Sequence, residues 1–367
     1  MASRSFKSLS VLIFSLVSML FATAVYAENA PETAGHGTEQ AGQEKKEGEF
    51  DPAELIMEHI LDAHEFHFFT LGESEISIPL PVIVYSKERG LAAFSYGNFH
   101  HGHEAYNGYK SEEGKIVAVD AEGKIDEAVT LYDFSLTRNV VQMFLALTLL
   151  VVLMINVANK YKKGGAKTAP SGFQNAVEPV ITFVRDEVAK PNLGHAYNKY
   201  MPYLLTVFFF ILINNIVGLI PGTANVTGNI AFTVVLGVIS FFVIVFSTNK
   251  HFWGHIFNPP VPFLVKFILV PVEFIGIFTK PFALIVRLFA NMVAGHIIIT
   301  CFVMLIFIFG AMSQVAGWGF SPVSVAFTVF IYLIEILVAF IQAFIFTNLT
   351  AVFIGQSREG AHDDAHH

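Results

Sequence analysis

The sequence reads Ala283-Leu-Ile-Val-Arg-Leu-Phe-Ala-Asn-Met-Val-Ala-Gly-His296 in the middle of a longer apolar run, Leu264 to Gly310. Arg287 carries a permanent positive charge, because a guanidinium stays protonated under all ordinary protein conditions. At the centre of a membrane helix such a charge costs about 3 kcal/mol on insertion scales. A chain keeps the charge there only where water or another charge meets it. Arg287 is therefore predicted to belong to a functional site.

The composition predicts a protein with several membrane helices. Of the 367 residues, 54% are hydrophobic and 14% are charged, whereas soluble domains average about 25% charged residues. The net charge of −8 arises mainly in the N-terminal third, and between residues 191 and 355 the only acidic residues are Glu273 and Glu335. No basic stripe indicates nucleic acid as a partner. The single cysteine, Cys301, excludes an internal disulfide.

The N-terminus, residues 1–27, has the pattern of a secretory signal peptide. Arg4 and Lys7 precede a short apolar run, and Val25-Tyr-Ala27 offers small residues for cleavage before Glu28. The alternative is an uncleaved first membrane helix. If the segment is a signal peptide, the residues that follow it are exported.

Two regions follow the signal peptide. Residues 28–49 are polar and predict a disordered linker. Residues 50–135 predict a small exported segment of α/β type, with a helix around Ala53–His64 and strands at Ile76–Tyr85 and Lys115–Val119. Its histidines are His59, His64, His67, His100, His101 and His103. Their spacing matches no zinc site, so surface histidines are favoured over a metal site, and no cofactor is predicted.

The membrane channel domain is predicted at residues 136–358, with a tail at residues 359–367. The first span, Asn139–Ala158, is followed by four lysines: Lys160, Lys162, Lys163 and Lys167. The positive-inside rule places that end in the cytoplasm and the N-terminal segment outside. With five spans in all, the C-terminal tail is cytoplasmic as well.

The next three segments continue this topology. Phe173–Ala189 has apolar residues at spacings of three and four and predicts an amphipathic helix along the cytoplasmic membrane surface. Met201–Leu219 then runs outward and Ile230–Phe246 runs inward. Trp253–Pro262 is predicted as a cytoplasmic loop.

Two long apolar stretches complete the domain, Leu264–Gly310 and Pro322–Gly355, joined by a short Gly/Ser/Trp connection. Both exceed the ~20 residues that a perpendicular span needs, so tilting or breaking is implied, with Pro271 and Pro281 as breaks in the first stretch. The predicted fold is thus an all-α polytopic membrane protein of about five spans, two of them long and tilted, plus the small exported segment.

Polar residues recur every seven positions in the first long stretch, at Lys266, Glu273, Lys280 and Arg287. A heptad drifts by only about 20° on a straight helix, so the four predict one slowly turning stripe. The prolines weaken this inference for the earlier members. Lys266 and Lys280 can equally be anchors whose side chains reach the interface.

A second set of polar residues is divided between the two long stretches. Arg287 and Asn291 are four residues apart and share a face, whereas His296 points roughly to the opposite side. A carboxylate in lipid needs water or a partner, and imidazole exchanges protons near physiological pH. His296 and Glu335 on adjacent tilted helices therefore predict a proton relay, with a structural ion pair as the alternative. No catalytic motif is visible, so the chain is not expected to be an enzyme alone.

Three motifs carry a resemblance to a known family. Lys280-Pro-Phe-Ala-Leu-Ile-Val-Arg-Leu-Phe-Ala-Asn-Met-Val-Ala-Gly-His296 closely resembles the signature of subunit a of F-type ATP synthases. Glu335-Ile-Leu-Val-Ala-Phe-Ile-Gln-Ala-Phe-Ile-Phe-Thr-Asn-Leu-Thr350 resembles the second motif of that family. Asn215-Ile-Val-Gly-Leu-Ile-Pro-Gly222, followed by Thr223–Asn229, resembles the turn between its second and third helices. The resemblance covers about residues 139–355, in the family's order.

The resemblance implies a function in proton-driven ATP synthesis, as the stator subunit that provides two proton half-channels to a rotating ring of c subunits. Arg287 is then the arginine that meets each ring carboxylate and separates the half-channels. Asn291 and Gln342 lie beside it, Glu335 and His296 line the outer half-channel, and Glu273 belongs to the cytoplasmic one. The implied partners are the c-ring, the b-subunit peripheral stalk, the rest of the complex and the lipid bilayer of a bacterial inner membrane.

The sequence departs from the family in two ways. Many members carry the acid at the position of His296 and the histidine at that of Glu335, and this exchange argues that the two residues are close in space. The exported segment is also longer than in many relatives. Two other classes of protein share some of these features. A proton-coupled secondary transporter also uses charges at the membrane midplane, but the chain shows no internal repeat, and a receptor with a simple membrane anchor would have no reason to keep Arg287.

Overall fold

The computed structural model describes residues 62–71, 74–99, 104–112, 114–120, 123–126, 129–164, 172–220, 222–248, 250–257, 259 and 261–358. The signal peptide, the linker and the C-terminal tail predicted above lie outside these ranges. So does most of the predicted helix at Ala53–His64, and its described end, residues 62–64, is not helical.

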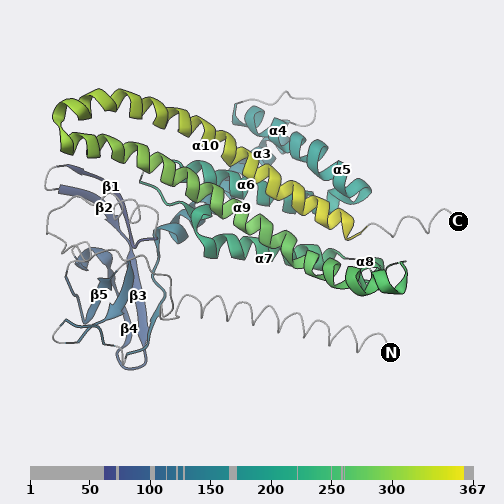
Figure 1. Cartoon of the computed structure of the whole chain (residues 1–367), viewed down its shortest axis with the longest axis horizontal. Coiled ribbons are helices and arrows are strands. Elements are labelled where there is room, and N and C mark those ends of the chain that lie inside the picture. The colour runs from purple at the N-terminus through teal and green to yellow at the C-terminus, as the bar shows by residue number, and fades with distance from the viewer. Residues whose placement is uncertain are drawn as a thin grey trace. The chain divides into compact units, whose positions relative to one another are not determined.

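Seven strands form the first described region (Figure 1). They are β1 (Glu65–Leu71), β2 (Ser74–Pro79), β3 (Pro81–Ser86), β4 (Gly90–Ser95), β5 (Tyr109–Glu112), β6 (Lys115–Ala118) and β7 (Leu131–Asp133). They make three antiparallel sheets, with the orders β1-β2, β4-β3-β7 and β5-β6. The two predicted strands are confirmed, except that the first is divided at Leu80.

The core of this strand region lies on one face of β3. Val82 and Val84 are fully buried and belong to one cluster with Phe99 and Tyr109. Because side chains alternate along a strand, the residues between them, such as Tyr85, point to the opposite face and are exposed.

His64 is an exception to the prediction that the histidines of this region lie on the surface. Its side chain is buried and stacks on Tyr96, with the ring centroids 5.6 Å apart. Its Nε2 lies 3.6 Å from Asp133 Oδ2. The side chains of the other five histidines lie outside the described residues.

We expect Asp133 to make the strand region less stable in acid. Partial burial raises the pKa of Asp133, but the neighbouring His64 imidazole and hydrogen bonds from Ser135 outweigh this and hold that pKa below its ordinary value of 3.8. The stabilisation is therefore present above pH 3.8 and is lost as the pH falls through the lower pKa of the folded state. Hydrogen exchange at the Phe134 amide, which donates to Ile83 O, should report this loss. In Asp133→Asn this loss of protection in acid should be absent. An equal loss of protection in both proteins would show that Asp133 is not its cause.

The remaining described residues are mainly helical. The elements are α3 (Arg138–Gly164), α4 (Phe173–Phe183), the π-helix η2 (Val184–Ala189), α5 (Lys190–Leu193), α6 (Tyr197–Gly218), the 3-10 turn η4 (Val226–Gly228), α7 (Ile230–Ser247), α8 (Lys250–Phe257), α9 (Phe263–Met312) and α10 (Gln314–Gln356). Five helical segments are long and apolar enough to cross a membrane. The polytopic α-helical fold is therefore confirmed. The predicted loop Trp253–Pro262 is wrong in part, because α8 extends to Phe257.

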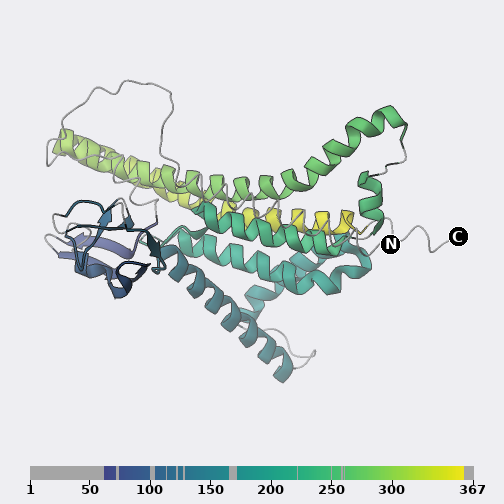
Figure 2. The same cartoon turned by 90° about the horizontal axis from the view of Figure 1, so that it is seen from below.

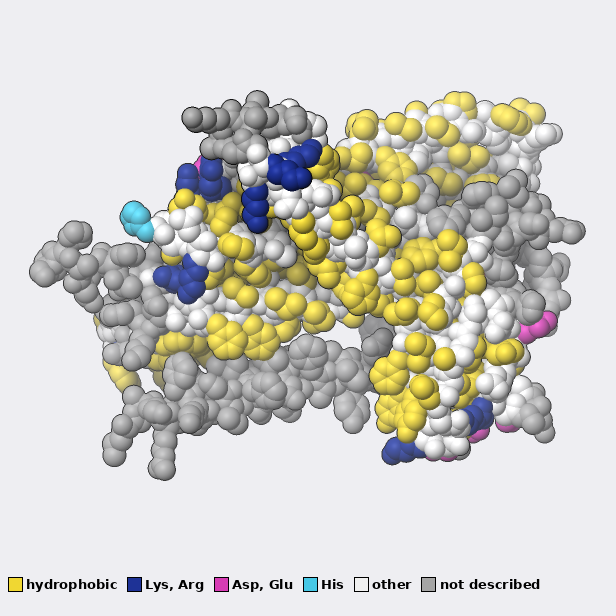
Figure 3. Space-filling model, turned by 180° about the vertical axis from the view of Figure 1, so that it is seen from behind, with side chains coloured by type: hydrophobic (Ala, Val, Ile, Leu, Met, Phe, Trp, Pro, Cys, Tyr) yellow, Lys and Arg dark blue, Asp and Glu magenta, His cyan; other side chains and the backbone are white. Residues whose placement is uncertain are grey.

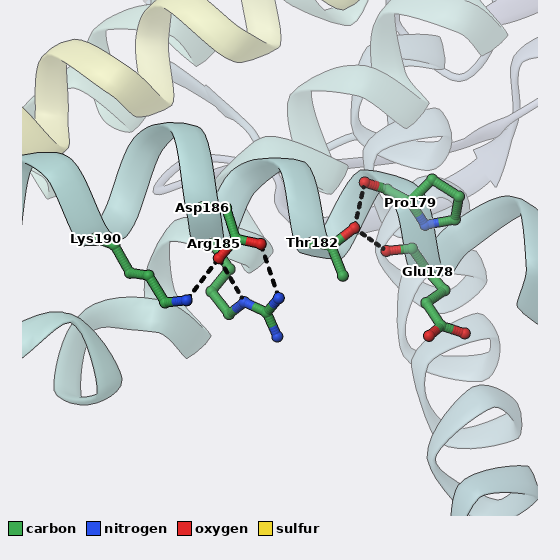
Figure 4. A network of polar contacts seen from close by, with 6 residues as sticks. All are labelled: Glu178, Pro179, Thr182, Arg185, Asp186 and Lys190. Atoms are coloured by element: carbon green, nitrogen blue, oxygen red, sulfur yellow. Dashed lines mark hydrogen bonds and ion pairs between the residues drawn. The ribbon is translucent and has the colours of Figure 1, made fainter. Parts of the chain in front are cut away.

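The amphipathic segment has the two faces that its sequence predicts. Val177, Val184 and Val188 are buried. On the other side, the Arg185 guanidinium donates to both oxygens of Asp186 at 3.0 and 2.8 Å, and Lys190 Nζ donates to the same carboxylate at 2.7 Å (Figure 4). The position of this segment at the cytoplasmic membrane surface remains a prediction.

The two longest helices differ from the prediction in their continuity. α9 contains Pro271 and Pro281 but is not interrupted; it bends instead (Figure 2), because a proline removes one hydrogen bond while the adjacent turns hold. The predicted Gly/Ser/Trp connection is also wrong, since Ser313 is the only residue between α9 and α10 that is not helical. At 1.5 Å per residue, α9 is about 75 Å long, far more than a bilayer needs.

Large hydrophobic side chains are exposed along the helices (Figure 3). In α3 they are Phe144, Leu145, Leu147, Leu149, Val151, Val152 and Ile155. Exposed apolar surface of this extent is the surface that a membrane helix presents to lipid.

Candidate functional site

Arg287 and Asn291 lie on an open face of α9. Both are exposed, and so are Ala290 and Ala294 beside them, whereas Leu288 and Met292 are buried on the other side of the helix. Within the described ranges Arg287 forms no ion pair. The small alanines leave room for another helix to approach closely. Arg287 thus presents its charge on the outer face of α9.

Glu335, unlike Arg287, is buried inside the protein. It is only 7% exposed, and its carboxylate packs directly on the backbone of Gly295 in α9, where an added Cβ would overlap it. His296 is the next residue along that helix. His296 Nε2 and Glu335 Oε2 are both buried, and neither has a hydrogen-bond partner among the described residues. Gly295, the neighbour of His296 in α9, thus meets the acid of α10, and no hydrogen bond or ion pair joins His296 to Glu335 among the described residues.

Two asparagines bond to the backbone of α9 and α10 near His296 and Glu335. Asn225 Nδ2 donates to Met292 O in α9, and Asn215 Nδ2 donates to Ala339 O in α10, both at 3.3 Å. Because α9 and α10 are antiparallel, His296 and Glu335 each lie one turn from these bonds, toward Ser313.

These asparagines belong to a polar network that was not predicted from the sequence. Thr227 Oγ1 donates to Asn215 Oδ1 at 2.7 Å. Gln142 of α3 donates its amide to Ala224 O and accepts from Ala224 N. The sequence did contain a sign of this network, because Gln142 is a strongly polar residue in an apolar span. The turn around η4 is thereby fixed to α3, α6 and α9, and Asn215 joins α6 to α10.

The opposite end of α9 is joined to the end of α10. Lys280 Nζ donates to Gln356 Oε1 at 3.2 Å and lies 5.0 Å from the centre of the Phe353 ring. Lys280 therefore binds side chains of α10, in addition to any role as an anchor at the membrane interface. Glu273 is half-buried in α9, and Gln342 is buried in α10. The heptad positions lie on one continuous helix, although breaks at Pro271 and Pro281 were predicted.

We expect Gly295→Ala to reduce any activity that depends on the Glu335 carboxylate about tenfold or more, since misplacing a reacting group by about 1 Å can cost even more. The added methyl group has to displace the Glu335 carboxylate. The end of that side chain can move, so the thermal stability should change little. Gly276→Ala in the same helix is the matched control, because its added methyl group meets nothing within 4 Å. Full activity in Gly295→Ala would show that the position of Glu335 is unimportant.

Taken together, five apolar helices, buried polar groups between two long helices and an exposed arginine define a polytopic membrane protein with a polar site at membrane depth. The ATP synthase A chain family matches residues 140–355. The chain belongs to that family and is similar to subunit a of F-type ATP synthases. A separate match, to a domain of unknown function, covers residues 55–134.

Several relatives carry the corresponding name. "ATP synthase subunit a" of Chloroherpeton thalassium is 49% identical over 242 residues, which cover 64% of this chain and 71% of that protein. "ATP synthase subunit a 2" of Chlorobaculum tepidum is 37% identical over 376 aligned positions, covering 96% and 91%. The protein of the same name from Prosthecochloris aestuarii is 38% identical over 372 positions, covering 100% and 96%.

Proposed function

We propose that this chain is the stator subunit that conducts protons to and from the c-ring of an F-type ATP synthase through two half-channels. One observation carries the proposal: the buried Glu335 carboxylate lies against Gly295, beside His296, while Arg287 is exposed on another part of α9. A proton-accepting pair inside the chain and a fixed charge on its surface are the two parts that such a device requires.

In the proposed mechanism, protons enter from outside through the Glu335 and His296 path and pass to a carboxylate on the ring. Arg287 then attracts each deprotonated carboxylate, which has the opposite charge, and repels a hopping proton, which has the same charge. Both interactions are strong away from bulk water. Protons leave on the cytoplasmic side past Glu273, with Asn291 and Gln342 near the arginine. Each elementary charge crossing 100 mV releases about 2.3 kcal/mol, and this work drives rotation.

The proposal also fixes orientation and partners. The N-terminal segment lies in the periplasm, the C-terminus lies in the cytoplasm, and the protein resides in a bacterial inner membrane. The c-ring and the b-subunit peripheral stalk are its direct partners. The synthesis of ATP itself takes place in the rest of the complex.

Purification in mild detergent with mass spectrometry tests the assignment. We expect the chain to co-purify with a c-ring and with the other subunits of the synthase. An isolated chain that transports a solute with protons after reconstitution would instead support the alternative, a proton-coupled secondary transporter.

A further inference from the structure

One face of the β4-β3-β7 sheet is apolar and uncovered. Tyr85 of β3 pairs with Leu91 of β4 on one side and with Tyr132 of β7 on the other. Leu91 is 70% exposed, Tyr132 47% and Tyr85 42%, and Phe134, two residues beyond Tyr132, is 65% exposed. We call these four residues the aromatic row; none of them is charged.

The exposure is specific to this face. The alternate residues of β3, Val82 and Val84, are fully buried in the core of the strand region. Strands lie about 4.8 Å apart, so the row crosses the three strands within about 10 Å. The Tyr85 and Tyr132 rings lie 6.4 Å apart. The row is thus a compact surface, separate from the core.

The sheet is joined to the start of α3 without a free linker. The pairing of β3 with the chain after β7 continues through Phe134 N to Ile83 O and Leu136 N to Pro81 O. The next bond joins Arg138 N, the first residue of α3, to Ala63 O. Asn139 N also donates to the Asp62 carboxylate. Backbone bonds therefore hold the strand region at the end of the first membrane-spanning helix.

We propose that the aromatic row rests in the lipid headgroup zone of the leaflet at which α3 begins. Phe134 is four residues from Arg138, so at most about 14 Å of chain separates it from the start of the span. The row therefore lies close to the end of α3 at which the strand region is held. Its composition fits this occupant, because Tyr and Phe have rings that enter the boundary of the acyl chains while a phenolic hydroxyl stays hydrated.

This docking gives the exported segment a function that does not depend on proton conduction. The segment would set the depth and tilt of α3 by resting on the bilayer, in the way that interfacial aromatic anchors do. The competing occupant is a protein, either a second copy of the chain or another subunit, and the experiment distinguishes lipid, protein and water at the row.

Spin labels in the assembled complex provide the test. Cys301 is replaced by alanine, and single cysteines are introduced as Leu91→Cys and Tyr132→Cys, with Lys124→Cys as the control at an exposed position outside the row. Nitroxide-labelled complexes are reconstituted in vesicles of phosphatidylethanolamine and phosphatidylglycerol. Electron paramagnetic resonance then compares collisions with oxygen, which concentrates in lipid, and with a water-soluble nickel chelate. A sample without an introduced cysteine supplies the background.

We expect both row labels to collide with oxygen more than with nickel, and the control label to show the reverse. Row labels that favour nickel, like the control, would show that the face is in water and overturn the proposal. Labels shielded from both reagents would show that a protein covers the face and overturn it equally. Retained ATP synthesis in each labelled complex verifies that the fold is intact.

Discussion

Arg287→Ala is expected to abolish proton-driven ATP synthesis and to raise passive proton leakage through the membrane. Arg287 is exposed on α9 and has no ion pair among the described residues, so its charge is available to a carboxylate of the ring. Without it, a ring carboxylate loses the partner that keeps it ionised, and the barrier to a proton passing directly between the half-channels disappears. ATP synthesis and pH-sensitive dye quenching in inverted vesicles measure the two effects.

A second arginine provides the control for this experiment. The guanidinium of Arg185 is paired with Asp186 on an exposed surface, and such pairs contribute at most about 1 kcal/mol. Arg185→Ala should therefore leave synthesis and leakage close to the wild type. Normal synthesis in a fully assembled Arg287→Ala complex would refute the proposed mechanism.

Exchanging His296 and Glu335 together is expected to be milder than either single replacement. In the proposed relay, His296→Glu alone supplies two carboxylates and Glu335→His alone two imidazoles, and like groups that lie close together disfavour ionisation of one another. The double variant restores one acid and one imidazole. A double-mutant cycle on the rate of proton-driven synthesis measures the coupling.

The exchange tests the relay that the proposed function assigns to the two residues. Each single variant is expected to lose most of its activity, and the double variant should recover at least about tenfold, a coupling of about 1.4 kcal/mol. If the double variant is as impaired as the worse single variant, the two residues do not act as a pair.

The sequence predicted the helices well because their apolar runs are long and uninterrupted by charge. It also singled out Glu335, His296 and Arg287, since ionisable groups in apolar helices are costly enough to be conspicuous. It did not predict that Glu335 packs on Gly295, because a contact between helices depends on their relative rotation, which spacing within one helix leaves open.

Other features were missed for local reasons. Pro271 and Pro281 were read as breaks, but the turns on either side keep α9 continuous. The connection after Gly310 looked like a loop from its glycines and serines, yet packing of Phe309 on Phe320, with ring centroids 4.5 Å apart, holds both helices there. Strands β1, β4, β5 and β7 were missed because short strands carry little periodic signal.

Ser313 has a mechanical consequence. One extended residue joins α9 to α10, the Phe302 and Phe327 rings stack 5.5 Å apart, and Ser324 Oγ donates to Phe302 O. Two helices that cannot slide along each other bend together as one thicker unit, and this unit resists bending more than two separate helices would. Under the proposed function, sideways load from a turning ring on α9 is therefore carried by both helices, and the stator yields less with each step.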